Sequence, residues 1–506
     1  MSFVEKKSVE NTNFVSLKPE RVPVVMNVVS GEFAISKVIS VVPIAKLEQI
    51  IPNNKSAQIE GKLCAKVIVE TADGTYKCLS SETLFKTMVI DEKIGLDSTL
   101  LASCSVASIS GISAGTQSVS VTITVEIIPR LLVKNNLTYV QSLEVAEVRS
   151  EEIKYCDVFA CNSQEFNIEL ELEQPQSISE ILCVDSKMQI LNVEAGADVV
   201  RISGEVVTNL IYLTSDEPAK LKNQFYIQAF SHEILANNLQ KDDLVSVKAN
   251  IWGTEIKLEG ELSSAKGTII LLTSVKADIV ISKEQTLSVV VDAFCPKYNL
   301  NLTSCETNFV GIEECNKSIE KVDSSIVLGE ESERIDRVLG VCGHCVVVDR
   351  ISKENETAFV EGKIICNVVF TLDDENCSVN SILSTIPFKL SLPVKSEVSD
   401  VEIVARDVDA RHKRSKEIDI ICELAITLKS SSNCAYSYLS DATLGEKRNE
   451  KYSPMSLYYV KSVNNLWDLS KKLCVSGDLI MEQNPNLTFP IDSLQKVLVY
   501  RKRNSN

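Results

Sequence analysis

The sequence is poor in aromatic and basic residues and contains no long hydrophobic run. Aromatic residues make up 6% of the 506 residues, and 52 Lys and Arg stand against 69 Asp and Glu, a net charge of −17. Such an acidic chain repels a phosphate backbone and an anionic lipid surface. No apolar stretch of about 18 residues appears, and residues 1–14 lack the apolar core of a secretion signal. We therefore expect no nucleic-acid partner, no membrane insertion, and a protein that stays in the cytosol that made it.

Val and Ile dominate the apolar composition. The chain contains 58 Val and 45 Ile residues, whose branching at Cβ favours the pleated strand. Hydrophobic residues make up 44% and charged residues 24%, close to an average soluble protein. The length exceeds one ordinary core, since domains cluster near roughly 100 to 200 residues. The composition predicts several mainly β domains.

A glycine-centred pattern occurs three times. Each glycine has an apolar run before it, a dense apolar run shortly after it, and a strand-like run farther on. These runs lie at 38–41, 67–69 and 119–128 around Gly61, at 181–184, 210–212 and 269–281 around Gly204, and at 338–341, 368–370 and 418–428 around Gly362. A chance glycine match would not keep these distances, and the alternation within the runs has the period of a half-buried strand.

The repeats set the expected domain organisation. We predict a mainly β protein with three tandem β-sandwich-like modules at 1–130, 131–282 and 283–430. Residues 431–454 are rich in Ser, Asn and charges and are expected to be a linker.

The last fifty residues change period. Residues 466–473 read as a short amphipathic helix capped by Asn464 or Asn465, and 476–483 as a second helix. Strand candidates lie on either side, at 457–461 and 496–500. We predict a small C-terminal βααβ module over 455–503.

This segment resembles the LysM module. Residues 458–461 match the family's opening Tyr-x-Val-Lys, 466–470 its Leu-Trp-x-Ile-Ala, and 480–485 its Leu-x-x-x-Asn-Pro, while 495–499 match its final strand. LysM modules that hold N-acetylated glycans carry Gly-Asp in the first loop and Pro-Gly in the last. Here Val463-Asn464 and Ser493-Leu494 stand there and add side chains where a sugar would approach.

The resemblance implies a compact module that exposes Lys461, Val463, Trp467 and Leu487 to a protein partner. Two roles are possible for Trp467: its side chain packs inside the module, or it anchors a protein partner. The candidate partner-binding residues are Tyr459, Lys461, Val463, Asn464, Leu466, Trp467, Asn486, Leu487 and Leu494.

The whole layout resembles the SPOCS-domain spore coat morphogenetic proteins of endospore-forming bacteria, which combine such β repeats with a C-terminal LysM. Residues 291–300 also resemble the family's Asp-Ala-Tyr-Ser-Pro-x-Tyr-Asn-Leu sequence. The resemblance implies a non-enzymatic scaffold without cofactors, in the mother-cell cytoplasm at the forespore surface. Its LysM would bind the basement-layer coat ATPase of the SpoIVA type, and other coat proteins could join.

Two alternatives remain open at this point. One is a LysM protein that binds peptidoglycan or chitin of the spore cortex or cell envelope. The other is a zinc-dependent enzyme that uses Cys342, His344 and Cys345, the only Cys-x-x-Cys segment. No four-ligand pattern surrounds this segment, and the equivalent positions 41–42 and 184–185 hold no thiol pair, which favours a structural role. The sixteen scattered cysteines are expected to be reduced and mostly buried.

Overall fold

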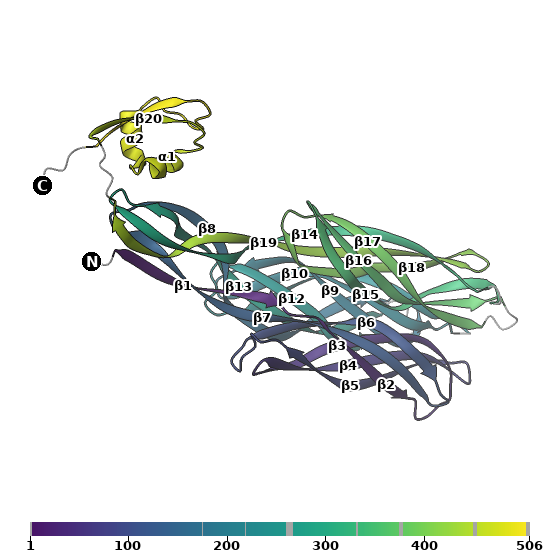
Figure 1. Ribbon diagram of the computed structural model, residues 1–506. Coiled ribbons are helices and arrows are strands. Elements are labelled where there is room, and N and C mark those ends of the chain that lie inside the picture. The colour runs from purple at the N-terminus through teal and green to yellow at the C-terminus, as the bar shows by residue number, and fades with distance from the viewer. Residues whose placement is uncertain are drawn as a thin grey trace.

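The computed structural model of the protein describes residues 3–174, 176–217, 219–259, 267–329, 332–373, 378–448 and 453–501. Over these ranges it contains twenty-one strands and two short helices. The prediction of a mainly β fold is confirmed. The strands form one elongated body, and a small α/β module lies beyond one end of it (Figure 1).

Module 1 is built from two antiparallel sheets that enclose one hydrophobic core. The first sheet contains β3 (Ile35–Asn53), β4 (Ser56–Thr71) and β5 (Tyr76–Ile90). The facing sheet contains β2 (Glu20–Val29), β6 (Leu100–Ala114) and β7 (Ser118–Leu143), and β1 (Val4–Ser16) pairs with the far half of β7.

Modules 2 and 3 repeat this arrangement, each around its own core. The sheets of module 2 are β9 (Ile178–Ala195), β10 (Val199–Thr214) and β11 (Leu221–Leu235), and β8 (Glu147–Glu173), β12 (Leu244–Glu259) and β13 (Thr268–Phe294). Those of module 3 are β15 (Ile335–Glu354), β16 (Thr357–Leu372) and β17 (Val379–Pro393), and β14 (Tyr298–Val327), β18 (Glu397–Arg414) and β19 (Glu417–Lys447).

Side-chain alternation explains why these segments form half-buried strands. Along β7, Val119, Val121 and Ile123 are fully buried, while the Ser and Thr residues between them are half-buried. Successive side chains of a strand point to opposite faces, and β-branched residues suit a pleated surface. One face of the strand therefore supplies the core of the sandwich.

The repeat glycine sits on the middle strand of the first sheet in each module. Gly61, Gly204 and Gly362 lie directly opposite Phe85, Phe230 and Phe388 on the third strand. At Gly204, a Cβ would meet the backbone carbonyl of Gln189, where the first strand is irregular. Glycine thus lets two strands and an aromatic ring approach closely.

The three modules meet through equivalent strands. β5 contacts β9, β11 contacts β15, and β17 contacts β3. Each of these contacts, called a junction below, joins the third strand of one module to the first strand of the next, so that the modules close a ring. Ile68, Ile211 and Val369, which follow the repeat glycines at the same distance, share one buried cluster at its centre.

The long strands of the second sheets run beyond the modules and form a narrower extension, called the stalk (Figure 1). Three antiparallel pairs build it: β1 with β7, β8 with β13, and β14 with β19. Tyr139, Tyr155 and Phe309 share a cluster inside the stalk, which is separate from the module cores. The ring of modules and the stalk together are called the body below.

The strands cross the expected module boundaries. β7 continues across 130/131, β13 across 282/283 and β19 across 430/431. Residues 431–447, expected to be part of a linker, continue β19 and pair with β14. Their polar composition suggested a linker, but Tyr438 and Leu439 are buried in two separate hydrophobic clusters of the stalk. Residues 449–452, and 502–503 of the expected C-terminal module, lie outside the described residues.

The C-terminal module has the predicted order of strand, two helices and strand. β20 (Met455–Val460) pairs with β21 (Gln495–Tyr500), and α1 (Leu466–Leu473) and α2 (Gly477–Gln483) lie between them in the chain. Asn465 and Ser476 cap the helices by accepting hydrogen bonds from the backbone N–H groups of Asp468 and Leu479. Neither helix of the described chain has the length and apolarity needed to cross a bilayer.

Candidate binding site on the C-terminal module

The C-terminal module has its own hydrophobic core, which takes up two of the predicted binding residues. Val463 is 5% exposed and Leu487 is 9% exposed, and both belong to the cluster formed by the helices and the inner face of the sheet. The expectation that these two side chains are exposed is wrong. Val463 exchanges backbone hydrogen bonds with Ile491 at 3.2 and 2.8 Å, which draws the first loop against the last and turns its side chain inward.

The other predicted residues are distributed over several surfaces. Lys461, Asn464, Asn486 and Leu494 are exposed. Leu466, which begins α1, is half-buried and packs against the core. The structure thus places these four exposed residues outside the strands and does not gather them into one apolar patch, whereas Tyr459 is exposed on β20.

Trp467 attaches the module to the stalk. Its indole Nε1 donates a 2.9 Å hydrogen bond to Asp292 Oδ2, and its ring meets the ring of Phe294 edge-on at 5.3 Å. Lys471, one turn later on α1, places its ammonium 2.7 Å from Asp292 Oδ1. Burial raises the pKa of Asp292, but the hydrogen bonds from Lys471 and Trp467 outweigh it and hold that pKa below its usual value. Trp467 therefore anchors the C-terminal module to the stalk of the same chain.

The sheet of the module leaves one face uncovered. The helices pack on the inner face, where Val460, Val497 and Val499 are buried. The opposite face, called the outer face below, carries the other residues of the two strands: Met455, Leu457 and Tyr459 on β20, opposite Tyr500, Leu498 and Lys496 on β21.

The outer face is apolar and exposed. Met455 is 62%, Leu457 52% and Tyr459 58% exposed, and Tyr500 is also exposed. Since α1 contacts the stalk, the outer face lies on the far side of the module (Figure 1). Contiguous apolar residues on a small surface are typical of an interaction site.

Positive charge borders this face. The Lys496 ammonium lies 5.8 Å from the centre of the Tyr459 ring, and Lys461 follows directly after β20. A partner with an apolar segment and acidic neighbours would match this surface.

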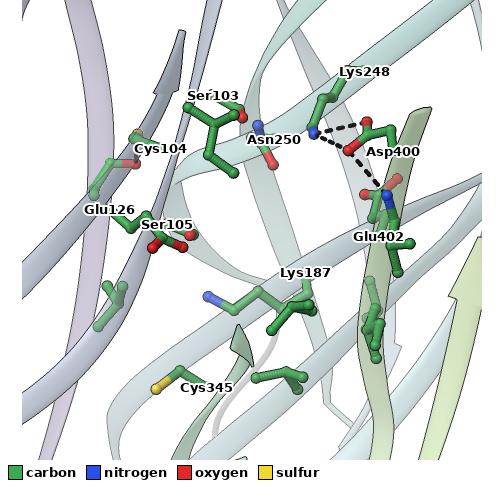
Figure 2. Close-up of a pocket in the computed structure, with 18 of the residues that line it drawn as sticks. Ser103, Cys104, Ser105, Glu126, Lys187, Lys248, Asn250, Cys345, Asp400 and Glu402 are labelled. Carbon is green, nitrogen blue, oxygen red and sulfur yellow. Dashed lines mark hydrogen bonds and ion pairs between the residues drawn. The ribbon is translucent and has the colours of Figure 1, made fainter. Parts of the chain in front are cut away.

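A cavity of about 480 Å³ lies inside the ring of modules. Strands β6, β7, β9, β12, β15 and β18 supply polar side chains to it, so all three modules contribute (Figure 2). Lys248 Nζ on β12 lies 2.9 Å from Asp400 Oδ2 on β18, so this ion pair joins modules 2 and 3. Lys187 Nζ pairs with Asp185 at 3.1 Å.

Burial keeps the cavity groups in forms that react little. It raises the pKa of Cys104 and of Cys345 to about 12, so both thiols are protonated at neutral pH. It lowers the pKa of His344 and raises that of Glu402. An activated thiol is a thiolate beside a cation or a base, and these two thiols lack that character.

The Cys-x-x-Cys segment is split between two environments. Cys342 lies in the cluster at the centre of the ring, whereas His344 and Cys345 line the cavity. Over the described ranges, no three His, Cys, Asp or Glu side chains are grouped so that they could hold a metal ion. The structure therefore does not bring Cys342, His344 and Cys345 together as a ligand set.

Sequence reasoning missed most of the outer face and the anchor. The alternation of Met455, Leu457 and Tyr459 was a readable signal, because a two-stranded sheet covered by helices on one face exposes its other face. The contact between Trp467 and Asp292 joins residues 175 positions apart and leaves no local signal.

Comparison of the chain with protein-family models, with curated proteins and with solved structures found no match in any of the three. The functional conclusion therefore depends on the geometry of the C-terminal module and its place on the stalk.

Proposed function

We propose that this protein is a non-enzymatic scaffold whose C-terminal module binds a protein partner through the outer face. The observation that carries the proposal is this exposed apolar face on a module anchored at the tip of the stalk. Apolar and aromatic side chains at a well-defined patch supply most of the binding energy of protein interfaces.

The body fits a supporting role. Its modules bury their shared surfaces at three junctions and a common central cluster, and the cavity inside the ring holds paired charges and protonated thiols. A rigid support that holds a binding module at a distance is useful in an assembly, where position matters as much as affinity.

The partner class comes from resemblance and surface chemistry together. The resemblance to SPOCS-domain proteins with a LysM end suggests a spore coat ATPase of the SpoIVA type, at the forespore surface in the mother cell. The outer face, bordered by Lys461 and Lys496, suits a partner segment with apolar residues and acidic neighbours.

The decisive experiment measures binding of the full-length protein to a purified ATPase of this type by biolayer interferometry. Leu457→Asp places a charge in the centre of the outer face. We expect it to weaken binding by at least about 30-fold, the usual effect of a hot-spot change. Leu84→Asp, on an exposed strand residue of module 1 that is 69% exposed, is the matched control and is expected to bind as the wild type.

Leu494→Ser tests whether the partner binds the outer face or the loops at 463–464 and 493–494, where glycan-binding LysM modules contact sugar. Leu494 is exposed in the last loop, outside the two strands, and we expect less than a threefold change in affinity. If Leu494→Ser abolishes binding while Leu457→Asp does not, the site is in the loops. Retention of the wild type on chitin or peptidoglycan, lost on Leu494→Ser, would establish the glycan-binding alternative instead.

A further inference from the structure

The three junctions of the ring place equivalent residues against each other. Ile68, Ile211 and Val369 on the middle strands are the reference positions. Opposite them on the third strands lie Cys78, Asn223 and Ser381, and opposite them on the first strands lie Ser40, Cys183 and Gly340. Because each third strand contacts the first strand of the next module, the facing pairs are Cys78 with Cys183, Asn223 with Gly340, and Ser381 with Ser40.

Contacts confirm that the junctions are built alike. Lys66, five residues after Gly61, donates to the Val184 carbonyl at 3.4 Å. Asn209, five residues after Gly204, donates to the Val341 carbonyl at 3.2 Å. The two bonds join equivalent positions in successive junctions, so the same approach of a middle strand to the next module recurs at both.

The chemistry at these equivalent positions differs. At the junction of modules 2 and 3, the Asn223 amide occupies the space beside Gly340. At the junction of modules 3 and 1, the Ser381 hydroxyl donates to the Val38 carbonyl at 3.3 Å. Only the junction of modules 1 and 2 places two thiols at these facing positions, and both lie at the same buried cluster, close enough to shift each other's pKa.

Neighbouring contacts hold this thiol pair in register. Lys77, next to Cys78, forms a 2.9 Å ion pair with Glu180 on the strand that carries Cys183. Cys183 is 2% exposed in the central cluster, whereas Cys78 is only partly buried at its edge. A small reagent in solution therefore reaches Cys78 first.

The two thiols also differ in reactivity. The hydrogen bond from Cys183 lowers the pKa of Cys78 despite its burial, and the Lys66 charge acts in the same direction. The same hydrogen bond and burial raise the pKa of Cys183 well above its usual value. Cys78 thus has the character of an attacking thiol and Cys183 that of a resolving thiol.

We propose that Cys78 and Cys183 are an oxidation site at which a low-molecular-weight disulfide closes a covalent bond between modules 1 and 2. The Cys78 thiolate attacks the small disulfide RSSR and releases one RS⁻, leaving a mixed disulfide. Cys183 then gives up its proton, attacks the Cys78 sulfur and releases the second RS⁻. Two protein thiols and RSSR become one protein disulfide and two RSH. The bond locks one junction of the ring.

The test is oxidation of the folded full-length protein with oxidised glutathione, followed by alkylation and peptide mapping by mass spectrometry. We expect a peptide that links Cys78 to Cys183, formed before any other intramolecular link. Thermal unfolding of the oxidised protein should shift upward by about 4 °C, because the bond closes a loop of about 100 residues. Reduction with dithiothreitol should reverse the shift.

Matched variants complete the test. Cys78→Ser and Cys183→Ser should each abolish both the link and the shift, while Cys64→Ser, which removes a half-buried thiol of the neighbouring strand β4, should keep both. The exposed Cys315 should form only a mixed disulfide and serves as an internal control in the wild type. Stable glutathionylation of Cys78 without a link to Cys183 would overturn the proposal, and so would a shift that survives in either Ser variant.

Discussion

The body and the C-terminal module use their apolar faces in opposite ways. In the body, the outward side of each middle strand is covered by the neighbouring modules, and charges pair between modules, as with Lys248 and Asp400. In the C-terminal module, the equivalent side of the sheet stays open, and Trp467 and Lys471 make the main polar contact with one carboxylate of the stalk, Asp292. The three β modules cover one another's outward sheet faces, whereas the single C-terminal module leaves its outer face available to another molecule.

The largest expected effect in the body comes from its repeat glycine. Gly204→Ala would put a Cβ against the Gln189 carbonyl and within 3.0 Å of the Ile190 Cα, which are backbone atoms that cannot move aside cheaply. We expect a loss of about 3 kcal/mol, the upper range for overpacking. Urea unfolding followed by far-ultraviolet circular dichroism would show a lower midpoint for the body.

Gly95→Ala is the matched control for this change. A Cβ at Gly95 comes no closer than 3.8 Å to another atom, the Ser98 Oγ, so the substitution should change stability by less than about 0.5 kcal/mol. Equal midpoints for the two variants would mean that close strand approach at the repeat glycine is not what closes each module.

A smaller effect is expected from the charge pair that joins modules 2 and 3. Lys248→Met leaves Asp400 with a side chain only 26% exposed and without its main cation. We expect a loss of about 2 kcal/mol at pH 7, the order of cost for a poorly hydrated charge without a partner. Lys77→Met is the control, because Lys77 and Glu180 are 43% and 44% exposed and should contribute less than about 1 kcal/mol.

The loss in Lys248→Met should depend on pH. In the wild type, burial raises the pKa of Asp400 but Lys248 outweighs it, so the pKa lies below the usual 3.8 and the pair stabilises the fold above that value. In the variant, burial is opposed only by the smaller effects of Lys429 and Arg130, so we expect the folded pKa to rise and Asp400 to destabilise the fold increasingly as pH increases. The deficit, measured by urea unfolding, should be full at pH 7 and shrink below about pH 4. A deficit independent of pH would contradict this account.

How much could be predicted from the sequence depended on the range of the interactions. Local patterns predicted the strands, the equivalence of Gly61, Gly204 and Gly362, and both C-terminal helices to within one residue. The ring and the stalk come from contacts between residues far apart, and continuous strands crossed boundaries that composition had suggested. The burial of Val463 depends on a loop pairing with Ile491, which has no sequence signal.

The smallest expected effect concerns the attachment of the C-terminal module. Asp292→Asn keeps an oxygen for the Trp467 indole but removes the charge that Lys471 contacts. Because Lys471 is 47% exposed, we expect the docked state to lose only about 1 kcal/mol, a roughly fivefold shift toward release. In a Trp252→Phe background, Trp467 fluorescence should shift to longer wavelength as the indole leaves Phe294.

A pH titration distinguishes release of the C-terminal module from the stalk from unfolding of the module itself. The folded pKa of Asp292 is lowered, so its contribution is fully present above the usual 3.8 and is lost as pH falls through the lowered value. In the Trp252→Phe background with Asp292 intact, Trp467 emission should therefore be constant from pH 7 to 5 and shift only in stronger acid, whereas Asp292→Asn in the same background should lack this acid step. If both proteins show the same step, the indole reports unfolding of the module, and its anchor lies in the apolar contact with Phe294 rather than in the carboxylate.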